Sequence, residues 1–138
     1  MQYISTRGLE SSFSFSDILF EGYAEDGGLY VPAAFPEVDA HTLMTWRGLS
    51  YASLAFEVIR LFAEELPKED LWQICSEAYQ AKNFGHVRGM FTAEEITPVK
   101  WLHDQVGLLE LSNGPTLAFD DIAMQFMSRL FDTSFAQG

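Results

Sequence analysis

The stretch of residues 108–129 constrains the fold of this chain more than any other. It begins with the leucine-rich run LLEL at 108–111, which the turn-forming residues Ser-Asn-Gly-Pro follow at 112–115. This order predicts a buried strand that ends in a tight polar turn. Asp120 and Asp121 then begin a helical pattern, because acidic side chains in a first turn suit the positive end of the helix dipole. A strand, a turn and a helix N-terminus in one short run are a common setting for a functional site.

Three segments of the chain carry recognisable motifs: YISTRG at 3–8, DGGLYVP at 26–32 and SNGPTLAFDD at 112–121. They resemble the Y-x-STRG, DGGLYVP and HGPT-x-AFKD motifs of threonine synthases, in the same order. Threonine synthases are fold-type-II enzymes that use pyridoxal phosphate (PLP). The resemblance covers essentially the whole chain but only the N-terminal part of the family's length. It implies a mixed α/β fold in which a small sheet packs with helices, as in the N-terminal part of a fold-type-II PLP enzyme.

The resemblance also implies an activity, a cofactor and site residues. Threonine synthases convert O-phosphohomoserine to threonine, a lyase reaction of amino-acid biosynthesis, and the lysine of HGPT-x-AFKD forms a Schiff base with PLP. Asn113 stands at the position of the motif's histidine, and with Thr116 and Phe119 it would line the cofactor cleft. Asp120 stands at the position of the lysine. Because a carboxylate has no nitrogen with which to form an imine, we expect this chain to bind no PLP.

The same resemblance gives a division of residues 1–138. Residues 1–105 correspond to an N-terminal scaffold, and residues 106–138 correspond to the start of the PLP-binding domain. No Gly/Ser/Thr-rich loop that could hold the cofactor phosphate follows within these residues. We therefore expect the chain to be a fragment of the enzyme.

Composition and charge disfavour several classes of function. The 138 residues, 48% hydrophobic and 14% aromatic, are enough for one domain with a core. The net charge of −12 disfavours nucleic acids and anionic membranes as partners. Cys75 is the only cysteine, so no intramolecular disulfide can form, and no metal-ligand spacing is present. Without a signal peptide or an apolar run of roughly 18 residues, the sequence predicts a soluble, cytoplasmic protein.

Two helices are predicted in the middle of the chain, at 50–66 and 67–80, and their short connection favours an antiparallel hairpin. Phe56 falls on the polar side of the first helix, so we expect it to be exposed or to contact something outside this chain. Cys75 lies on the packing side of the second helix and is predicted to act as a small hydrophobe. The apolar residues at helical spacing are Leu54, Ala55, Val58, Leu61 and Phe62 in the first helix, and Leu71, Ile74, Cys75, Ala78 and Tyr79 in the second.

Short β-rich runs at 29–31, 99–102 and 108–111 are predicted to form one small sheet. Residues 36–48 are predicted to be a connecting loop, as are residues 83–89. The N-terminal part is predicted to hold an edge strand within residues 1–5, a turn at 5–8, a short helix from Ser14 or Ser16 to Phe20 and a turn at 25–28.

The helix that begins near Ile122 is apolar over more than half of its circumference. A helix of this kind needs cover on several sides. We therefore expect the remainder of the enzyme, or a second copy of the chain, to cover the side around Met124, Met127 and Phe131.

Asp120 and Asp121 could also be an acid/base pair or metal ligands. Adjacent residues on a helix point about 100° apart, and neither His86 nor His103 has ligand spacing to them. We therefore favour carboxylates at a helix start. Two functions stay open: the N-terminal portion of a threonine synthase-like enzyme that is not catalytic as this chain, or a non-catalytic binding module of the same family that uses Phe56 and the last helix.

Overall fold

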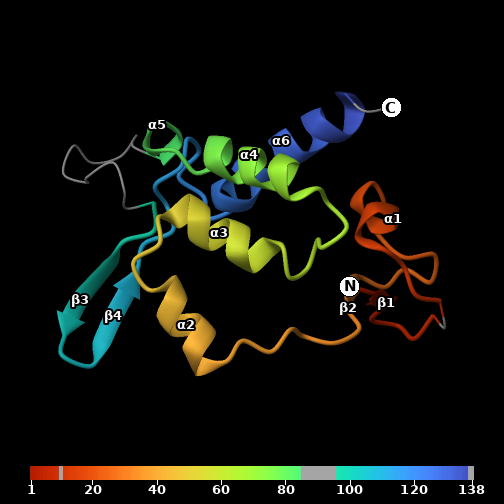
Figure 1. The fold of residues 1–138 in the computed structure, drawn as a ribbon, viewed down its shortest axis with the longest axis horizontal. Coiled ribbons are helices and arrows are strands. Elements are labelled where there is room, and N and C mark those ends of the chain that lie inside the picture. The colour runs from red at the N-terminus through yellow and green to blue at the C-terminus, as the bar shows by residue number, and fades with distance from the viewer. Residues whose placement is uncertain (10, 85–95, 137–138) are drawn as a thin grey trace. The chain divides into compact units, whose positions relative to one another are not determined.

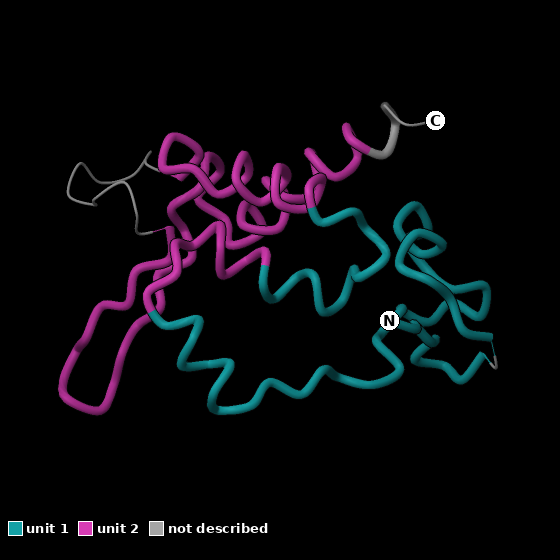
Figure 2. The backbone as a smooth tube through the Cα atoms, viewed as in Figure 1, with its two compact units in different colours: residues 1–47, 57–68 teal, residues 48–56, 69–138 magenta. Residues whose placement is uncertain are grey.

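The computed structural model describes residues 1–9, 11–84 and 96–136 and shows a mixed α/β fold, as predicted (Figure 1). The described residues form two compact units, residues 1–47 with 57–68 and residues 48–56 with 69–138 (Figure 2). The elements are, in chain order, β1 (Tyr3–Ser5), α1 (Phe15–Leu19), β2 (Tyr30–Pro32), α2 (Ala40–Trp46), α3 (Tyr51–Ile59), α4 (Lys68–Ala78), α5 (Ala81–Phe84), β3 (Val99–His103), β4 (Val106–Leu109) and α6 (Asp121–Ala136).

Two separate strand pairs replace the single sheet that the sequence predicted. In the first unit β1 pairs with β2 in an antiparallel register that places Tyr3 opposite Pro32. In the second unit β3 pairs with β4, with Val99 opposite Leu109. The prediction of one sheet from 29–31, 99–102 and 108–111 was therefore wrong. Because a two-residue turn joins β3 to β4, these strands find their partners locally and leave β2 to pair with β1.

Helix α1 begins as the sequence predicted, at an N-cap serine. The Ser14 hydroxyl accepts a hydrogen bond from the Asp17 N–H, and the Asp17 carboxylate accepts one from the Ser14 N–H, at 3.1 and 2.8 Å. This reciprocal capping box satisfies two N–H groups that a short helix would otherwise leave unpaired.

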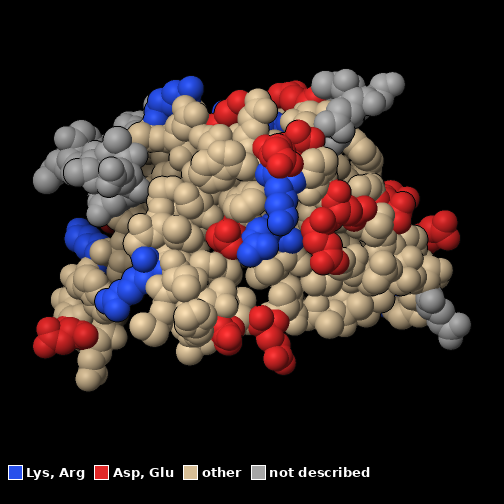
Figure 3. All heavy atoms as spheres, in the orientation of Figure 1, with Lys and Arg blue, Asp and Glu red and all other residues tan. Residues whose placement is uncertain are grey.

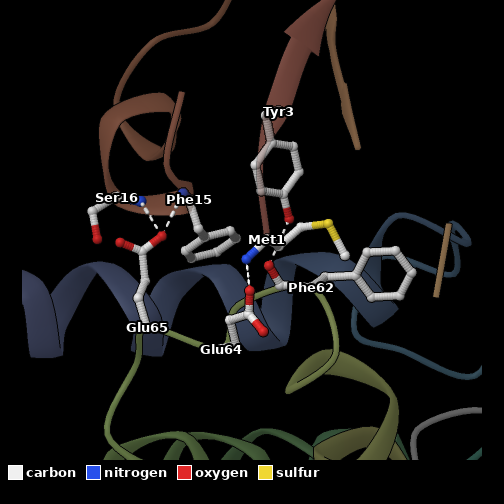
Figure 4. A network of polar contacts seen from close by, with 7 residues as sticks. All are labelled: Met1, Tyr3, Phe15, Ser16, Phe62, Glu64 and Glu65. Carbon is white, nitrogen blue, oxygen red and sulfur yellow. Dashed lines mark hydrogen bonds and ion pairs between the residues drawn. The ribbon is translucent and has the colours of Figure 1, made fainter. Parts of the chain in front are cut away.

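Residues 57–68 are held to the N-terminal residues of the same unit by the polar contacts drawn in Figure 4. The Tyr3 hydroxyl donates to the Phe62 carbonyl at 2.8 Å. Burial, and secondly the charge of Glu65, raise the pKa of this hydroxyl, so it stays protonated as a donor. The Glu65 carboxylate accepts the N–H groups of the first two residues of α1. A segment distant in sequence thereby becomes part of the first unit.

Helix α2 lies within residues 36–48, where the sequence predicted a loop, so that prediction was wrong. The Asp39 carboxylate caps the helix by accepting the Thr42 N–H at 2.7 Å. No residue of α2 is buried, and Leu43 and Met44 are exposed. The helix has seven residues, fewer than the roughly 11 over which a helical period can be recognised in a sequence.

In the second unit, residues 51–56 of α3 run antiparallel to residues 69–78 of α4, as predicted. The rings of Tyr51 and Tyr79 lie 5.1 Å apart between centroids, and those of Phe56 and Trp72 lie 5.8 Å apart, edge to face. The start of α3 therefore meets the residue after α4, while a later turn of α3 meets the first half of α4. The expectation for Phe56 was wrong, because Trp72 of this chain supplies its contact.

The two helices differ in burial. The predicted stripe of α4 is confirmed for Leu71, Ile74, Cys75 and Ala78, which are buried, whereas Tyr79 follows the helix and is half-buried. Helix α3 has no buried residue, and Leu54 and Val58 are each 38% exposed. Helix α3 also ends at Ile59 rather than at residue 66, because the chain tightens there into the i to i+3 bond from the Phe62 N–H to the Ile59 carbonyl.

Of the remaining elements of the second unit, α5 and α6 contribute buried side chains to the core, whereas β3 and β4 do not. Phe84 of α5 and Phe126 and Leu130 of α6 are buried, whereas Met124 of α6 is 57% exposed. Residues 85–89 of the predicted loop, with His86, lie outside the described residues. The strand predicted at 108–111 lies instead at Val106–Leu109, as β4, and every residue of β3 and β4 is exposed. The prediction of a buried strand there was wrong, because an apolar run looks alike in a buried strand and an exposed hairpin.

Candidate functional site

The candidate site is the turn that joins β4 to α6, and the Asp121 carboxylate holds it in shape. One oxygen of this carboxylate accepts the Thr116 N–H at 2.8 Å, and the other accepts the Thr116 hydroxyl at 2.9 Å. The carboxylate is buried. A Cβ on Gly114 would lie 2.3 Å from the Asp121 Cβ, so only glycine allows this approach. The Asp121 carboxylate, Thr116 and the backbone of Gly114 therefore hold one another in place.

Asn113 lies at the inner side of this turn. Its side chain is buried, and its amide donates to the Ile96 carbonyl at 3.3 Å. The hydrogen bond fixes the turn to the residues before β3 and uses a donor that a ligand would otherwise find. The structure thus places Asn113 and Thr116 in one turn, each with a partner inside the protein.

Phe119 and Asp120 lie on the outer side of the turn. The Phe119 side chain is 69% exposed, and Asp120 is exposed. The Asp120 main-chain carbonyl accepts the Met124 N–H at 2.9 Å and so belongs to the first turn of α6. Helix α6 begins at Asp121, which agrees with the prediction of carboxylates at a helix start.

Leu117 is strained in the middle of the turn. Its φ of 63° lies in the left-handed region, where a side chain costs about 1–2 kcal/mol. The bond from its N–H to the Gly114 carbonyl, at 3.2 Å, helps to hold it there. Backbone strain of this kind gathers at functional sites, so the conformation supports this turn as the site.

The role of Asp121 was missed by reasoning from the sequence, which treated it only as a residue of a helix start. The available signal was the spacing of Gly114, Thr116 and Asp121. In this turn the Asp121 carboxylate reaches back five residues to Thr116, and it can do so because Gly114 has no side chain at the point of contact.

The two N-terminal motifs meet in a second hydrogen-bonded cluster around a carboxylate. We call this cluster and the one around Asp121 nodes. The Ser5 hydroxyl donates to the Asp26 carboxylate, whose oxygens lie 2.7 and 2.9 Å from it. The same carboxylate accepts the N–H groups of Gly28 at 2.9 Å and Leu9 at 3.2 Å. These hydrogen bonds, that of Ser5 above all, hold the pKa of Asp26 below its usual value. The YISTRG and DGGLYVP motifs therefore hold each other.

Arg7 lies on this node. Its guanidinium donates to the Asp26 carbonyl at 3.2 Å. It also lies against Gly27, where a Cβ would come within 3.1 Å of the guanidinium nitrogen, and Gly27 has a φ of 75°. The described contacts of the Arg7 side chain are therefore within the first unit.

A hollow of about 420 Å³ lies in the second unit beside Ile96. Burial raises the pKa of both the Tyr51 and the Tyr79 hydroxyl, so both are neutral phenols at physiological pH. No charged side chain is among its described lining residues, so it is a poor receptor for a phosphate. The lining residues are Gly48, Leu49, Ser50, Tyr51, Ala52, Tyr79 and Ile96.

Three further observations narrow the chemistry. Burial raises the pKa of the Cys75 thiol to about 12, so it stays protonated within the core. Within residues 1–9, 11–84 and 96–136, no three His, Cys, Asp or Glu side chains come together as metal ligands, and no helix has the length and apolarity needed to cross a membrane. On the face drawn in Figure 3, acidic side chains lie in several places and the basic ones form no continuous surface.

Comparison with known proteins gives consistent matches. Residues 2–79 match the family described as Threonine synthase N terminus. The chain is 45% identical over 137 residues to a threonine synthase of Methylobacillus glycogenes, covering 99% of this chain and 29% of that protein. It is 44% identical to a threonine synthase of Corynebacterium glutamicum, with 96% and 27% covered.

Among solved structures, the PLP-bound threonine synthase of Brucella melitensis matches with a TM-score of 0.86 and 38% identity. That match covers 99% of this chain and 28% of the solved chain. The chain thus spans less than a third of the length of these relatives. It belongs to the threonine synthase family and corresponds to the N-terminal portion of its members.

Proposed function

We propose that this chain is the N-terminal portion of a threonine synthase-like enzyme and that, with Asp120, it forms no Schiff base with PLP. Residues 1–105 would be its scaffold and residues 106–138 the start of its PLP-binding domain. The observation that carries the proposal is the turn from Asn113 to Asp121. Its sequence resembles the HGPT-x-AFKD motif, and the side chain of residue 120 is exposed on its outer side.

The described residues of this turn do not fit PLP. When bound, PLP needs an amine for its aldehyde and hydrogen-bond donors for its phosphate. Position 120 offers a carboxylate instead. The Thr116 N–H and hydroxyl already donate to Asp121, and the Asn113 amide already donates to Ile96. Two adjacent carboxylates would also repel an anionic phosphate.

The test is to look for a covalent adduct at position 120. The chain and its Asp120→Lys variant are incubated with PLP, reduced with borohydride and mapped by mass spectrometry. Asp104→Lys, which places an amine on another exposed residue, is the matched control. We expect no specific adduct at position 120 in either protein, only the weak labelling that the control also shows. Neither protein is expected to have threonine synthase activity.

A stoichiometric adduct at position 120 of the Asp120→Lys variant, in excess of the control, would show that the cofactor site is more complete than we propose. Activity of the unmodified chain would overturn the proposal altogether. In a longer chain that carries Asp120 and continues into the rest of the family's fold, the same Asp120→Lys change is expected to restore the adduct, because the rest of the chain would supply the phosphate site.

A second candidate function, a non-catalytic module that associates through α6, is favoured by one observation. Met124 is 57% exposed on a helix whose opposite side, with Phe126 and Leu130, is buried. Apolar surface of this kind tends to find a partner in water. We expect light scattering to detect self-association that Met124→Gln reduces. A strict monomer at high concentration would count against this function.

A further inference from the structure

The hairpin of β3 and β4 carries an apolar surface on one side. Val99 lies opposite Leu109 and Trp101 lies opposite Gly107, so these four residues share one side of the hairpin, which we call the hairpin face. A Cβ on Gly107 would lie 2.9 Å from a methyl carbon of Val99 and 3.4 Å from the Trp101 ring. Both side chains therefore lie over Gly107 and join with Leu109 into one surface.

The hairpin face is open in the described structure. Val99, Trp101 and Leu109 are 50%, 67% and 52% exposed. Neither a charged residue nor a hydrogen-bonding side chain other than the Trp101 indole belongs to it, whereas the other side combines the charged Lys100 with Leu108, which is 49% exposed. A two-stranded hairpin is at best marginally stable in water unless another element covers its apolar face. The surface therefore has the character of an interface rather than of a solvated turn.

We propose that the hairpin face packs against the part of a threonine synthase chain that follows the N-terminal portion. The inference rests on the proposed function and deepens it by naming a partner. The fold of this chain recurs in the Brucella melitensis enzyme with a TM-score of 0.86, and there it makes up 28% of the chain. The remaining 72% (100 minus 28) is polypeptide that can cover a surface left open here.

Charge disfavours a second copy of this chain as the occupant. Each copy carries a net charge of −12, so a contact between two hairpin faces would have to overcome the repulsion between the copies; association through α6 does not require two hairpin faces to meet. The hairpin face itself has no basic residue that could offset this repulsion. The remainder of a larger enzyme does not have to carry the same charge.

Hydrogen exchange tests the proposal. The isolated chain is compared with a fusion in which it replaces the matching N-terminal residues of the Methylobacillus glycogenes threonine synthase. We expect amides of residues 99–109 to exchange at least about tenfold more slowly in the fusion, because covering the face suppresses local opening. Trp101→Ser combined with Leu109→Ser should remove that protection. Phe35→Ser, which removes a side chain that is 76% exposed in the first unit, should leave it intact.

Several outcomes would overturn the proposal: equal exchange of the hairpin in both proteins, protection that survives the double variant, or protection lost equally in Phe35→Ser. Protection of the isolated chain that grows with concentration would identify a second copy as the occupant and would also overturn it. If the fusion fails to fold, the same comparison between the full Methylobacillus enzyme and its matched N-terminal residues decides the question. The adduct at position 120 is measured separately, so the proposed function can fail while the hairpin proposal stands.

Discussion

Two nodes in this chain, one in each compact unit, are built from the same parts but join different lengths of chain. In the first unit the Asp26 carboxylate accepts the Ser5 hydroxyl and main-chain N–H groups, beside Gly28. In the second unit the Asp121 carboxylate accepts the Thr116 hydroxyl and N–H, beside Gly114. Each node thus needs an acid, a hydroxyl and a glycine.

The difference between the nodes lies in what each one fixes. The node of Asp26 joins residues 21 positions apart and holds β1 beside β2. The node of Asp121 joins residues five positions apart and fixes a turn before a helix. The node of Asp26 therefore stabilises the fold of the first unit, and the node of Asp121 fixes the backbone conformation next to residue 120. The same type of interaction, a carboxylate that accepts a hydroxyl and main-chain N–H groups, thus stabilises the fold in one motif and shapes the candidate site in another.

Replacing the glycine of each node should have the largest effect. In Gly114→Ala the new methyl group would lie 2.3 Å from the Asp121 Cβ, which is close to the backbone and cannot rotate away. We expect a loss of about 2–3 kcal/mol in the free energy of unfolding. Gly28→Ala should cost less, because the atom nearest to the new methyl group is the Ser5 hydroxyl oxygen, at 2.1 Å, which can turn aside at the expense of its hydrogen bond to Asp26; the nearest backbone atom, the Arg7 nitrogen, is 3.1 Å away.

Urea unfolding of the purified variants measures both losses. Gly22→Ala is the control, because nothing lies within 4 Å of a Cβ there. A Gly28 variant that is less stable than the Gly114 variant would show that the long-range node tolerates less change, which reverses the expected order.

Asp121→Asn should have the next largest effect. The amide replaces one of two acceptor oxygens with a donor, so either the Thr116 N–H or its hydroxyl loses a partner. Although Thr116 is exposed, each of these hydrogen bonds is made to a charged acceptor, and the loss of one costs about 1.5–3 kcal/mol. Thermal unfolding measures the loss, and Asp120→Asn, at an exposed position, is the matched control. An equal loss in both variants would mean that Asp121 does not hold the turn.

Sequence reasoning predicted those features that local chemistry determines. The capped start of α1 and the buried stripe of α4 follow from side chains a few residues apart. The turn at 25–28 follows from adjacent glycines, of which Gly27 has positive φ. Asp120 and Asp121 at the start of α6 were likewise predictable, because the helix dipole favours acids there.

The features that sequence reasoning missed depend on distant contacts or on the absence of burial. No local pattern shows that β2 pairs with β1 rather than with β3. Helix α2 spans only Ala40–Trp46, which is too short for a helical period to stand out in the sequence. The leucines of β4 predicted burial, yet whether an apolar strand is covered depends on what packs against it. The sequence correctly predicted Asp121 at a helix start, but its hydrogen bonds to Thr116 form only because of the shape of the turn, which the sequence pattern does not show.

The pH dependence of the two nodes should give the smallest and most specific difference. The folded-state pKa of Asp26 is lowered, so its ionised form stabilises the folded chain. This contribution is fully present above the unfolded pKa, about 4, and is lost as the pH falls through the lower folded pKa. In the first unit, Asp26→Asn should therefore lower the free energy of unfolding at neutral pH, and this deficit should shrink as the pH falls below about 4.

Asp39→Asn is a matched control, because Asp39 is an N-cap whose pKa is also lowered but which joins no distant strand. Unfolding by urea from pH 7 down to 3, followed by the fluorescence of the tryptophans and by exchange of β1 amides, separates the two. The Asp26 variant should lose protection in β1, whereas the Asp39 variant should keep it there, because asparagine caps a helix about as well as aspartate. A deficit that stays constant down to pH 3 would mean that the Ser5 hydrogen bond stabilises the node equally with a neutral carboxyl, and that charge has no part in joining the two motifs.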